Sequence, residues 1–241
     1  MKKFTKVLAA IILMAAMVFA AGCKPENDPN NGGGDNGGNT YNGHEYVDLG
    51  LPSGTLWATC NMGANAPEEY GDYYAWGDTT TKAIYDWNSY QYCNGDYDQL
   101  IKYCNYSDYG YNGFTDTLTM LQLMDDAATA NWGEGWCFPT ADQWRELRDN
   151  TICIWTTQND VNGCLFTAMN GAYIFLPAAG GRFDDVLDSA GNQGRYWSSS
   201  FNSDVSYYAK GFYLNSYNYD LGDYYRFLGF SVRPVRSASQ D

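Results

Sequence analysis

The stretch "CFPTADQWRELRDN" (137–150) carries the clearest fold signal in the chain. Thr140 followed by Gln143 is a capping-box pattern, which marks the start of a helix. Trp144 and Leu147 lie three residues apart, so a helix would place them on one face. The stretch therefore predicts a helix over about 141–149.

A second helical pattern precedes it, in "TDTLTMLQLMDDAATANW" (115–132). Its apolar residues are spaced by three or four positions, which would align them along one side of a helix. They are Leu118, Leu121, Met124, Ala128 and Trp132. We expect a second helix here.

Short strand patterns lie on both sides of the helices. Those before the helices cover 45–49 and 55–59, joined by the turn sequence "LPSG", and the glycine-bracketed 70–78. Those after the helices cover 173–176, 195–201, 208–215 and 230–236. Because strands and helices do not alternate, the order predicts an α+β fold rather than a β-α-β one.

Residues 80–114 show no helical or strand period and should form a long, ordered, irregular region. In 208–215, strand alternation would bury Phe212 and Leu214 and turn Tyr213 and Asn215 outward.

The N-terminus has the pattern of an export signal. A basic start and an apolar stretch, too short to span a bilayer, fill residues 1–22 and end at Cys23 in "AAGC". This ending resembles a lipobox, although Ala20 stands where a larger aliphatic residue is usual. We therefore expect lipidation of Cys23; the alternative is ordinary cleavage without lipid. The Gly- and Asn-rich 23–40 should be a flexible tether.

The predicted domain covers 41–236, with a short tail at 237–241. Cleavage before Cys23 would remove three lysines and no acid, taking the formal net charge from −14 to −17. Such acidity argues against nucleic acid and against anionic membrane surfaces as partners. We expect contact with the membrane only through the N-terminal lipid.

Six cysteines follow Cys23, and the sequence leaves their pairing open, including the option that several are buried free thiols. They are Cys60, Cys93, Cys104, Cys137, Cys153 and Cys164. Because none forms a C-x-x-C motif and His44 is the only histidine, we expect no zinc site and no cofactor.

Several strings together resemble the Fib-succ-major type paralogous domain of bacterial surface lipoproteins. They are "YVDLGLPSGTLWATCNMGA", "EEYGDYYAWGD", "DDAATANWGEGWCFPTADQWRELRD", "NGAYIFLPAAGGR", "GRYWSSS" and "GFSVRPVR". The resemblance spans about residues 44–236. It implies a C-type lectin-like fold of the formylglycine-generating-enzyme type: two helices on small twisted antiparallel sheets, long ordered loops, and N- and C-terminal strands brought together.

The resemblance also has a functional side. Proteins of this type include variable targets of diversity-generating retroelements, in which a C-terminal tract becomes rich in Tyr, Asn, Ser and Asp. Residues 201–230 have that composition. The resemblance therefore implies a surface whose residues vary between copies of the gene.

Catalysis is the less favoured expectation. Related formylglycine-generating enzymes use two cysteines late in the chain, and here none follows Cys164. A serine triad would depend on His44, near the tether, and there is no G-x-S-x-G motif. We expect a protein that is not an enzyme.

Other polar residues have mainly structural interpretations. Asp184, Asp185 and Asp188 offer oxygen ligands for calcium, but a solvated acidic loop explains them more simply. We expect the arginines to fix loops to the core, and five tryptophans to be core residues, with Trp87 and Trp132 left undecided. The arginines are Arg182, Arg195, Arg226 and Arg233; the tryptophans are Trp57, Trp76, Trp136, Trp144 and Trp197.

The tyrosine-rich tract is the candidate ligand-binding face. Seven tyrosines fall within residues 207–225, interleaved with Asn, Asp and Ser. Antibody binding loops use this mixture because Tyr gives large contact area at low entropy cost. The candidates are Tyr207, Tyr208, Lys210, Tyr213, Asn215, Tyr217, Tyr219, Tyr224, Tyr225, Phe227 and Phe230.

We expect an adhesin or receptor-like lipoprotein of the outer membrane, exposed at the cell surface, that binds an extracellular protein or glycan. A glycan-binding module of fixed specificity is the alternative, and it predicts an open groove with aromatic rings. An enzyme predicts a deep pocket with perturbed acids or thiols.

Overall fold

The computed structural model describes residues 39–237, which form a mixed arrangement of small antiparallel sheets and two α-helices. The α+β prediction is confirmed. The helices are α2 (Ala127–Trp132) and α3 (Ala141–Asn150), and the short 3-10 turns are η2 (Ser107–Tyr109), η3 (Tyr111–Gly113) and η4 (Leu123–Asp125). The strands are β1 (Asn39–Tyr41), β2 (His44–Asp48), β3 (Thr55–Ala58), β4 (Thr151–Gln158), β5 (Val161–Ala168), β6 (Tyr173–Pro177), β7 (Gly181–Phe183), β8 (Val186–Asp188), β9 (Gln193–Phe201), β10 (Tyr208–Asn215), β11 (Tyr219–Tyr225) and β12 (Val235–Ser237).

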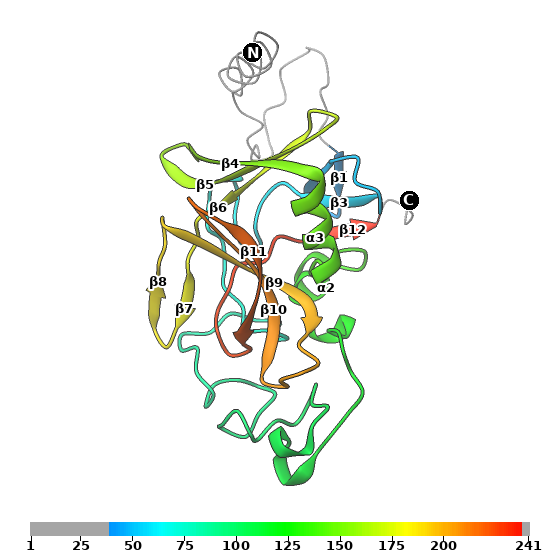
Figure 1. The fold of residues 1–241 in the computed structure, drawn as a ribbon, viewed down its shortest axis with the longest axis vertical. Helices are drawn as coiled ribbons and strands as arrows, with labels where there is room; N and C mark the ends of the chain where they lie inside the picture. The colour runs from blue at the N-terminus through cyan, green and yellow to red at the C-terminus, as the bar shows by residue number, and fades with distance from the viewer. Residues whose placement is uncertain (1–38, 238–241) are drawn as a thin grey trace, which may run out of the picture. The chain divides into compact units, whose positions relative to one another are not determined.

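The strands pair into four antiparallel sheets (Figure 1). Their orders are β1-β2-β3-β12, β4-β5-β6, β11-β10-β9 and β7-β8. In the first sheet, Val235 of β12 pairs with Trp57 of β3. The first and last described strands therefore lie in one sheet, as expected.

Helix α3 forms where the capping box predicts it. The Gln143 amide donates to Thr140 Oγ1 at 3.1 Å, and the Thr140 amide donates to Gln143 Oε1 at 2.8 Å. The helix ends at Asn150, one residue later than expected. Trp144 and Leu147 are both buried, and the Trp144 ring stacks on Phe212 of β10 with centroids 4.6 Å apart. This contact joins α3 to the C-terminal sheet.

The helix expected over 115–132 is wrong for most of its length. Only α2 is α-helical, because the Asp126 carboxylate accepts the backbone N–H groups of Ala128 and Thr129 and starts the helix there. The residues before it pair with β9 instead: the Leu121 amide donates to the Ser199 carbonyl at 2.9 Å. Met124, expected on the buried face, is 75% exposed.

Several strand predictions also change; of the predicted 230–236, only Val235 and Arg236 lie in a strand. Residues 70–78 do not form a strand; they make an isolated bridge between Tyr74 and Phe230. The β4–β5 hairpin, by contrast, was not predicted. Its strand β4 exposes the apolar Ile152 and Ile154, so the sequence there does not mark which face is buried.

The core confirms the tryptophan prediction. Trp57, Trp76, Trp136, Trp144 and Trp197 are all at most 1% exposed. They belong to two large clusters: Trp57 and Trp144 pack with Phe212, while Trp76, Trp136 and Trp197 pack with Phe230. The two undecided residues, Trp87 and Trp132, are partly buried.

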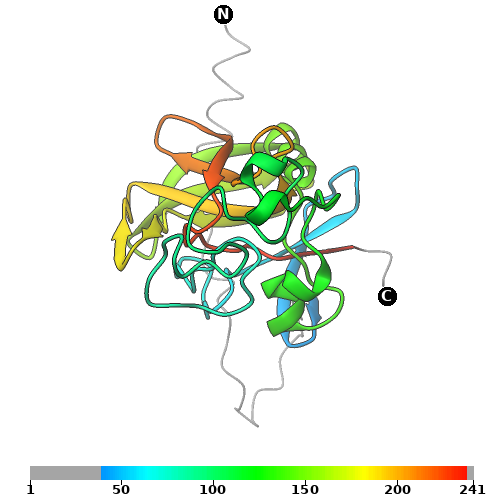
Figure 2. The ribbon, with the colours of Figure 1, turned by 90° about the horizontal axis from the view of Figure 1, so that it is seen from below.

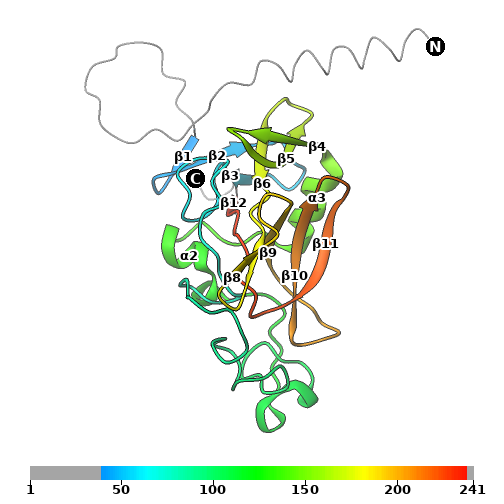
Figure 3. The same ribbon diagram turned by 90° about the vertical axis from the view of Figure 1, so that its left-hand side faces the viewer.

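Residues 80–114 are irregular, as predicted, apart from η2, η3 and isolated bridges. The segment runs along the end of the β9-β10-β11 sheet opposite the β10–β11 turn (Figures 1 and 3). Figure 2, a view from below, shows it spread across the near side of the molecule. It is therefore placed to share a surface with the C-terminal tract.

Candidate binding face

The β10–β11 hairpin is buried differently at its two ends. Tyr208 pairs with Tyr225, and Leu214 pairs with Tyr219. Near the turn, Phe212 and Leu214 are buried in the core, as the alternation predicted. At the far end, the side chains on the face that Phe212 and Leu214 share are exposed or half-buried. This end of the hairpin meets the irregular segment.

A continuous series of aromatic rings crosses that junction. Tyr207 is at its centre: its ring centroid lies 5.3 Å from Tyr97, 5.0 Å from Tyr109 and 5.8 Å from Tyr225, on which it stacks. These spacings suit edge-to-face and offset-stacked pairs. We call this surface the aromatic band; its members are Trp87, Tyr97, Tyr106, Tyr109, Tyr207, Tyr208 and Tyr225.

The aromatic band is partly exposed. Tyr97, Tyr106 and Tyr225 are 44%, 47% and 42% exposed. A hollow of about 330 Å³ beside it is lined by Tyr106, Asp108, Tyr109 and Asp204. Adjacent exposed aromatic side chains of this kind mark interaction sites more often than scattered ones. The surface is thus suited to contact with a partner.

Eleven sequence candidates separate into several locations. Tyr207, Tyr208 and Tyr225 lie in the aromatic band. Lys210, on the same face, forms an ion pair with Asp223, with Nζ and Oδ1 2.6 Å apart. The other seven candidates lie elsewhere on the hairpin or inside the molecule.

Asn215 and Tyr217 lie at the β10–β11 turn, the opposite end of the hairpin from the band. Tyr213 points to the other face of the sheet, where its hydroxyl accepts a 2.7 Å hydrogen bond from Asn218 Nδ2. Tyr219 is half-buried and its ring meets Phe166 edge-on. None of these side chains belongs to the aromatic band.

Tyr224 is half-buried for a local reason. Its ring lies over two glycines of the sheet: a Cβ added at Gly222 would come within 2.9 Å of the ring, and one at Gly211 within 3.1 Å. The ring also packs edge-on against Trp197 and Phe230. Tyr224 therefore closes a gap in the sheet surface.

The predictions that Phe227 and Phe230 bind ligand are wrong. Phe227 is 4% exposed and Phe230 is fully buried. The chain turns inward after β11: Phe230 stacks on Trp197 with centroids 4.3 Å apart, and Phe227 lies under Tyr225 at 5.6 Å. Phe227 supports the aromatic band from below, and Phe230 is part of the core.

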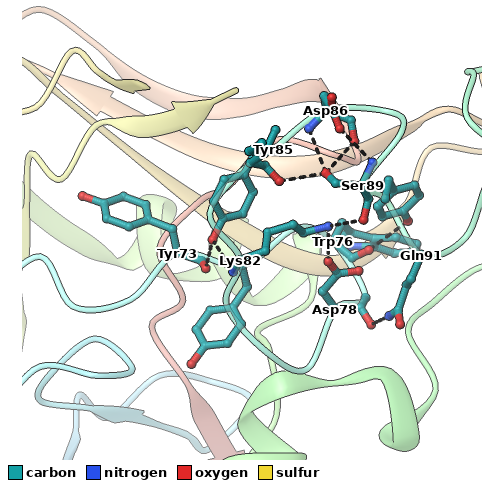
Figure 4. Close-up of polar contacts among 12 residues, drawn as sticks. Tyr73, Trp76, Asp78, Lys82, Tyr85, Asp86, Ser89 and Gln91 are labelled. Atoms are coloured by element: carbon teal, nitrogen blue, oxygen red, sulfur yellow. Dashed lines mark hydrogen bonds and ion pairs between the residues drawn. The ribbon is translucent and has the colours of Figure 1, made fainter. Parts of the chain in front are cut away.

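Polar contacts hold the irregular segment in place (Figure 4). The Tyr85 hydroxyl donates to the Tyr73 carbonyl at 2.5 Å, and Gln91 Nε2 donates to the Gly77 carbonyl at 2.6 Å. Lys82 Nζ donates to the Ser89 carbonyl at 2.9 Å and also pairs with the Asp78 carboxylate. The segment that carries Trp87 is thus fixed on both sides.

The four arginines make the structural contacts expected of them. Arg226 and Arg233 are buried and donate to backbone carbonyl oxygens, Arg233 to that of Phe175 at 2.9 Å. Arg195 pairs with Asp188 at 3.2 Å, and Arg182 lies 3.5 Å from the Asp185 carbonyl. The Asp185 contact stays within the β7–β8 hairpin, but the Arg182 guanidinium also lies 5.2 Å from the ring centroid of Tyr73.

Asp184 and Asp188 lie in the β7–β8 hairpin region and are not gathered around a common position for a calcium ion. Within residues 39–237, no group of three or more His, Cys, Asp or Glu side chains is arranged to hold a metal ion. His44 stacks on Trp132 at 3.7 Å, and burial lowers its pKa. The six cysteines of this part of the chain are free thiols.

The sequence did not predict that the irregular segment contributes side chains to the aromatic band. Tyr97, Tyr106 and Tyr109 were not candidates, because residues 80–114 have no period from which to assign an outward side. A compositional signal was present: eight tyrosines lie between positions 85 and 111. That density matches the C-terminal tract that it contacts.

Comparison with protein-family models, with curated proteins and with solved structures gave no match. No helix of the described part of the chain is long and apolar enough to cross a membrane. The expected signal peptide, Cys23 and nearly all of the tether lie outside the described residues.

Proposed function

We propose that this chain is a lipid-anchored, surface-exposed binding protein of the outer membrane whose aromatic band recognises an extracellular protein. Its domain would be C-type lectin-like. The resemblance of its sequence strings supports that assignment, as do two helices on small antiparallel sheets and the pairing of β12 with β3.

The observation that carries the proposal is the aromatic band itself. Rings from two segments about a hundred residues apart, around Tyr97 and around Tyr207, meet in one partly exposed surface. Interfaces are enriched in Tyr and Trp, whose side chains bury much area with few rotatable bonds. The mechanism is recognition on a preformed platform, and turnover is not part of it.

A protein is the favoured partner because the band joins rings from two segments and the hollow beside it is open to solvent. The acidic side chains at that hollow, Asp108 and Asp204, suit a partner that presents basic residues there. The net charge of −14 disfavours nucleic acid as a partner, because it repels the phosphate backbone.

Variation of the tract between gene copies is a further part of the proposal. Substitutions would then occur at outward positions such as Tyr207, Tyr208 and Tyr225, and not at the buried Phe227 and Phe230. Sequencing this locus across a cell population tests the idea. A uniform tract would leave a binding protein of fixed specificity.

The binding test uses the full chain and a panel of purified extracellular proteins. For a protein that binds, replacing both Tyr97 and Tyr225 by alanine should weaken binding at least about 30-fold, the effect of one hot spot of about 2 kcal/mol. Tyr217→Ala is the matched control, since it removes an exposed tyrosine at the other end of the same hairpin.

Equal affinity of the double variant and the unchanged protein would refute the role of the band. So would a larger loss with Tyr217→Ala. A glycan-binding function is the second candidate, and a separate feature of the structure favours it.

A further inference from the structure

A polar groove lies at the opposite end of the β10–β11 hairpin from the aromatic band. Its volume is about 350 Å³, within the range of small-molecule sites. Four segments form it: β4, the start of β5, the chain entering β9 and the β10–β11 turn. The lining residues are Trp155, Asn162, Gly191, Asn192, Gln193, Asn215, Ser216 and Tyr217.

The lining carries no charged side chain. Four of its eight residues are amides, one is a serine and two are aromatic, in a chain with 28 acidic residues. A site for an ion would need opposite charge, and burying an unpaired ion is costly. The groove is therefore suited to a neutral, polar ligand.

The amides keep unused hydrogen-bonding groups. Gln193 Oε1 accepts from Arg195 Nη2 at 3.0 Å, and Asn215 Oδ1 accepts the amides of Tyr217 and Asn218 at 2.8 Å each. Within the described chain these contacts leave the NH₂ groups of Gln193 and Asn215 without a partner, and the Asn192 side chain makes no hydrogen bond. Such amides supply both donors and acceptors, as paired hydroxyl groups require.

The two aromatic residues complete the chemistry. Tyr217 is 96% exposed, held on a turn whose backbone Asn215 fixes. Trp155 is partly buried against the core and lines the same groove. Aromatic rings with a polar edge cover apolar C–H faces while their polar atoms stay wet. A pyranose ring has one such face and a rim of hydroxyl groups.

We propose that this groove binds a neutral saccharide. The site goes beyond the proposed protein-binding function and shares no residue with the aromatic band. Asn215 and Tyr208 stand at the two ends of β10, which are about 23 Å apart at about 3.3 Å per residue. Because no carboxylate lines the groove, binding does not depend on calcium.

The test probes the full chain with an array of neutral oligosaccharides of glucose, galactose, mannose and N-acetylglucosamine, with sialylated and sulfated glycans alongside. Binding to at least one neutral class is expected, unchanged by chelation of calcium. Tyr217→Ala should weaken that binding at least tenfold, while Tyr225→Ala in the aromatic band should leave it unchanged.

A second readout locates the site. The bound saccharide should shift the side-chain amide resonances of Asn192, Gln193 and Asn215, and Asn192→Ala should also weaken binding. Tyr217→Ala should fold normally, because its ring makes no ring contact in the described structure. Failure to bind any neutral glycan, or binding that Tyr225→Ala abolishes and Tyr217→Ala does not, overturns the proposal without bearing on the protein-binding test.

Discussion

The buried guanidinium group of Arg226 donates a 3.1 Å hydrogen bond to the carbonyl oxygen of Tyr103. It also donates to the Lys102 carbonyl at 3.3 Å and lies 5.6 Å from the ring centroids of Trp76 and Tyr90. Arg226 directly follows Tyr225 of the aromatic band. One side chain thus ties the tyrosine tract to the irregular segment.

Replacing Arg226 by alanine should lower the free energy of unfolding by about 3 kcal/mol, since the carbonyl oxygens of Tyr103 and Lys102 lose a charged donor and a cavity opens. Urea unfolding measures this. Arg145→Ala is the matched control: Arg145 pairs with Asp142 at the surface of α3, and such pairs contribute at most about 1 kcal/mol. Similar losses for the two variants would contradict the anchoring role.

Stability should fall as the pH rises through about 6, because of Asp126. Burial raises the pKa of this carboxyl to about 6, against the opposing hydrogen bonds from Phe138, Thr129 and Ala128. In the unfolded chain it would titrate near its usual value of about 4. The folded state therefore keeps a proton over that interval, and a contribution of about 2–3 kcal/mol, present below pH 4, is lost above pH 6.

The measurement compares urea unfolding from pH 4 to 7 for the unchanged protein and for Asp126→Asn. The difference in free energy of unfolding between the two proteins should vary with pH over this interval. The contribution of His44 cancels in that difference, because His44 titrates in both proteins. Asp125→Asn is the control. Burial raises the pKa of Asp125, but hydrogen bonds from Lys102, Tyr103 and Tyr92 outweigh this and hold it below its usual value. Asp125→Asn should therefore change the pH dependence of the free energy of unfolding only below about pH 4. If the Asp126→Asn curve runs parallel to that of the unchanged protein from pH 4 to 7, the assignment to Asp126 is refuted.

The sequence was informative where the signal is local. The capping box of α3 needs only Thr140 and Gln143, and the alternation of β10 needs only its own residues, so both could be predicted. The non-helical path of the residues before Asp126 could not, because Leu121 pairs with Ser199, almost eighty residues away. The aromatic band could not be predicted for the same reason. The contact of Tyr97 with Tyr207 depends on tertiary structure, and residues 80–114 have no helical or strand period that would show which side chains face outward.

Lipidation of Cys23 would hold the protein at the membrane. Metabolic labelling with palmitate should mark the unchanged protein and not Cys23→Ser, because serine lacks the thiol to which the lipid would attach. Cys93→Ser, which keeps the N-terminal cysteine, should stay labelled. An unlabelled native protein with an N-terminus made by ordinary cleavage would exclude the lipid anchor.

Buried and exposed aromatic residues of the tyrosine tract should respond differently to substitution. Phe227→Ala and Phe230→Ala should each lower the free energy of unfolding by about 3–5 kcal/mol, because each removes a buried ring from the core. Tyr225→Ala should cost far less, since its ring is 42% exposed and Phe227 beneath it remains. Thermal and urea unfolding of the three variants, each measured beside its binding to a protein ligand, gives the comparison.

The expected pattern follows from burial: loss of stability at Phe227 and Phe230, and loss of binding with a stable fold at Tyr225. A stable, binding-deficient Phe230→Ala protein would mean that this ring contacts the ligand after all. A Tyr225→Ala protein that unfolds as readily as Phe230→Ala would show that the aromatic band is an extension of the core, and its exposed rings would then no longer support a binding face.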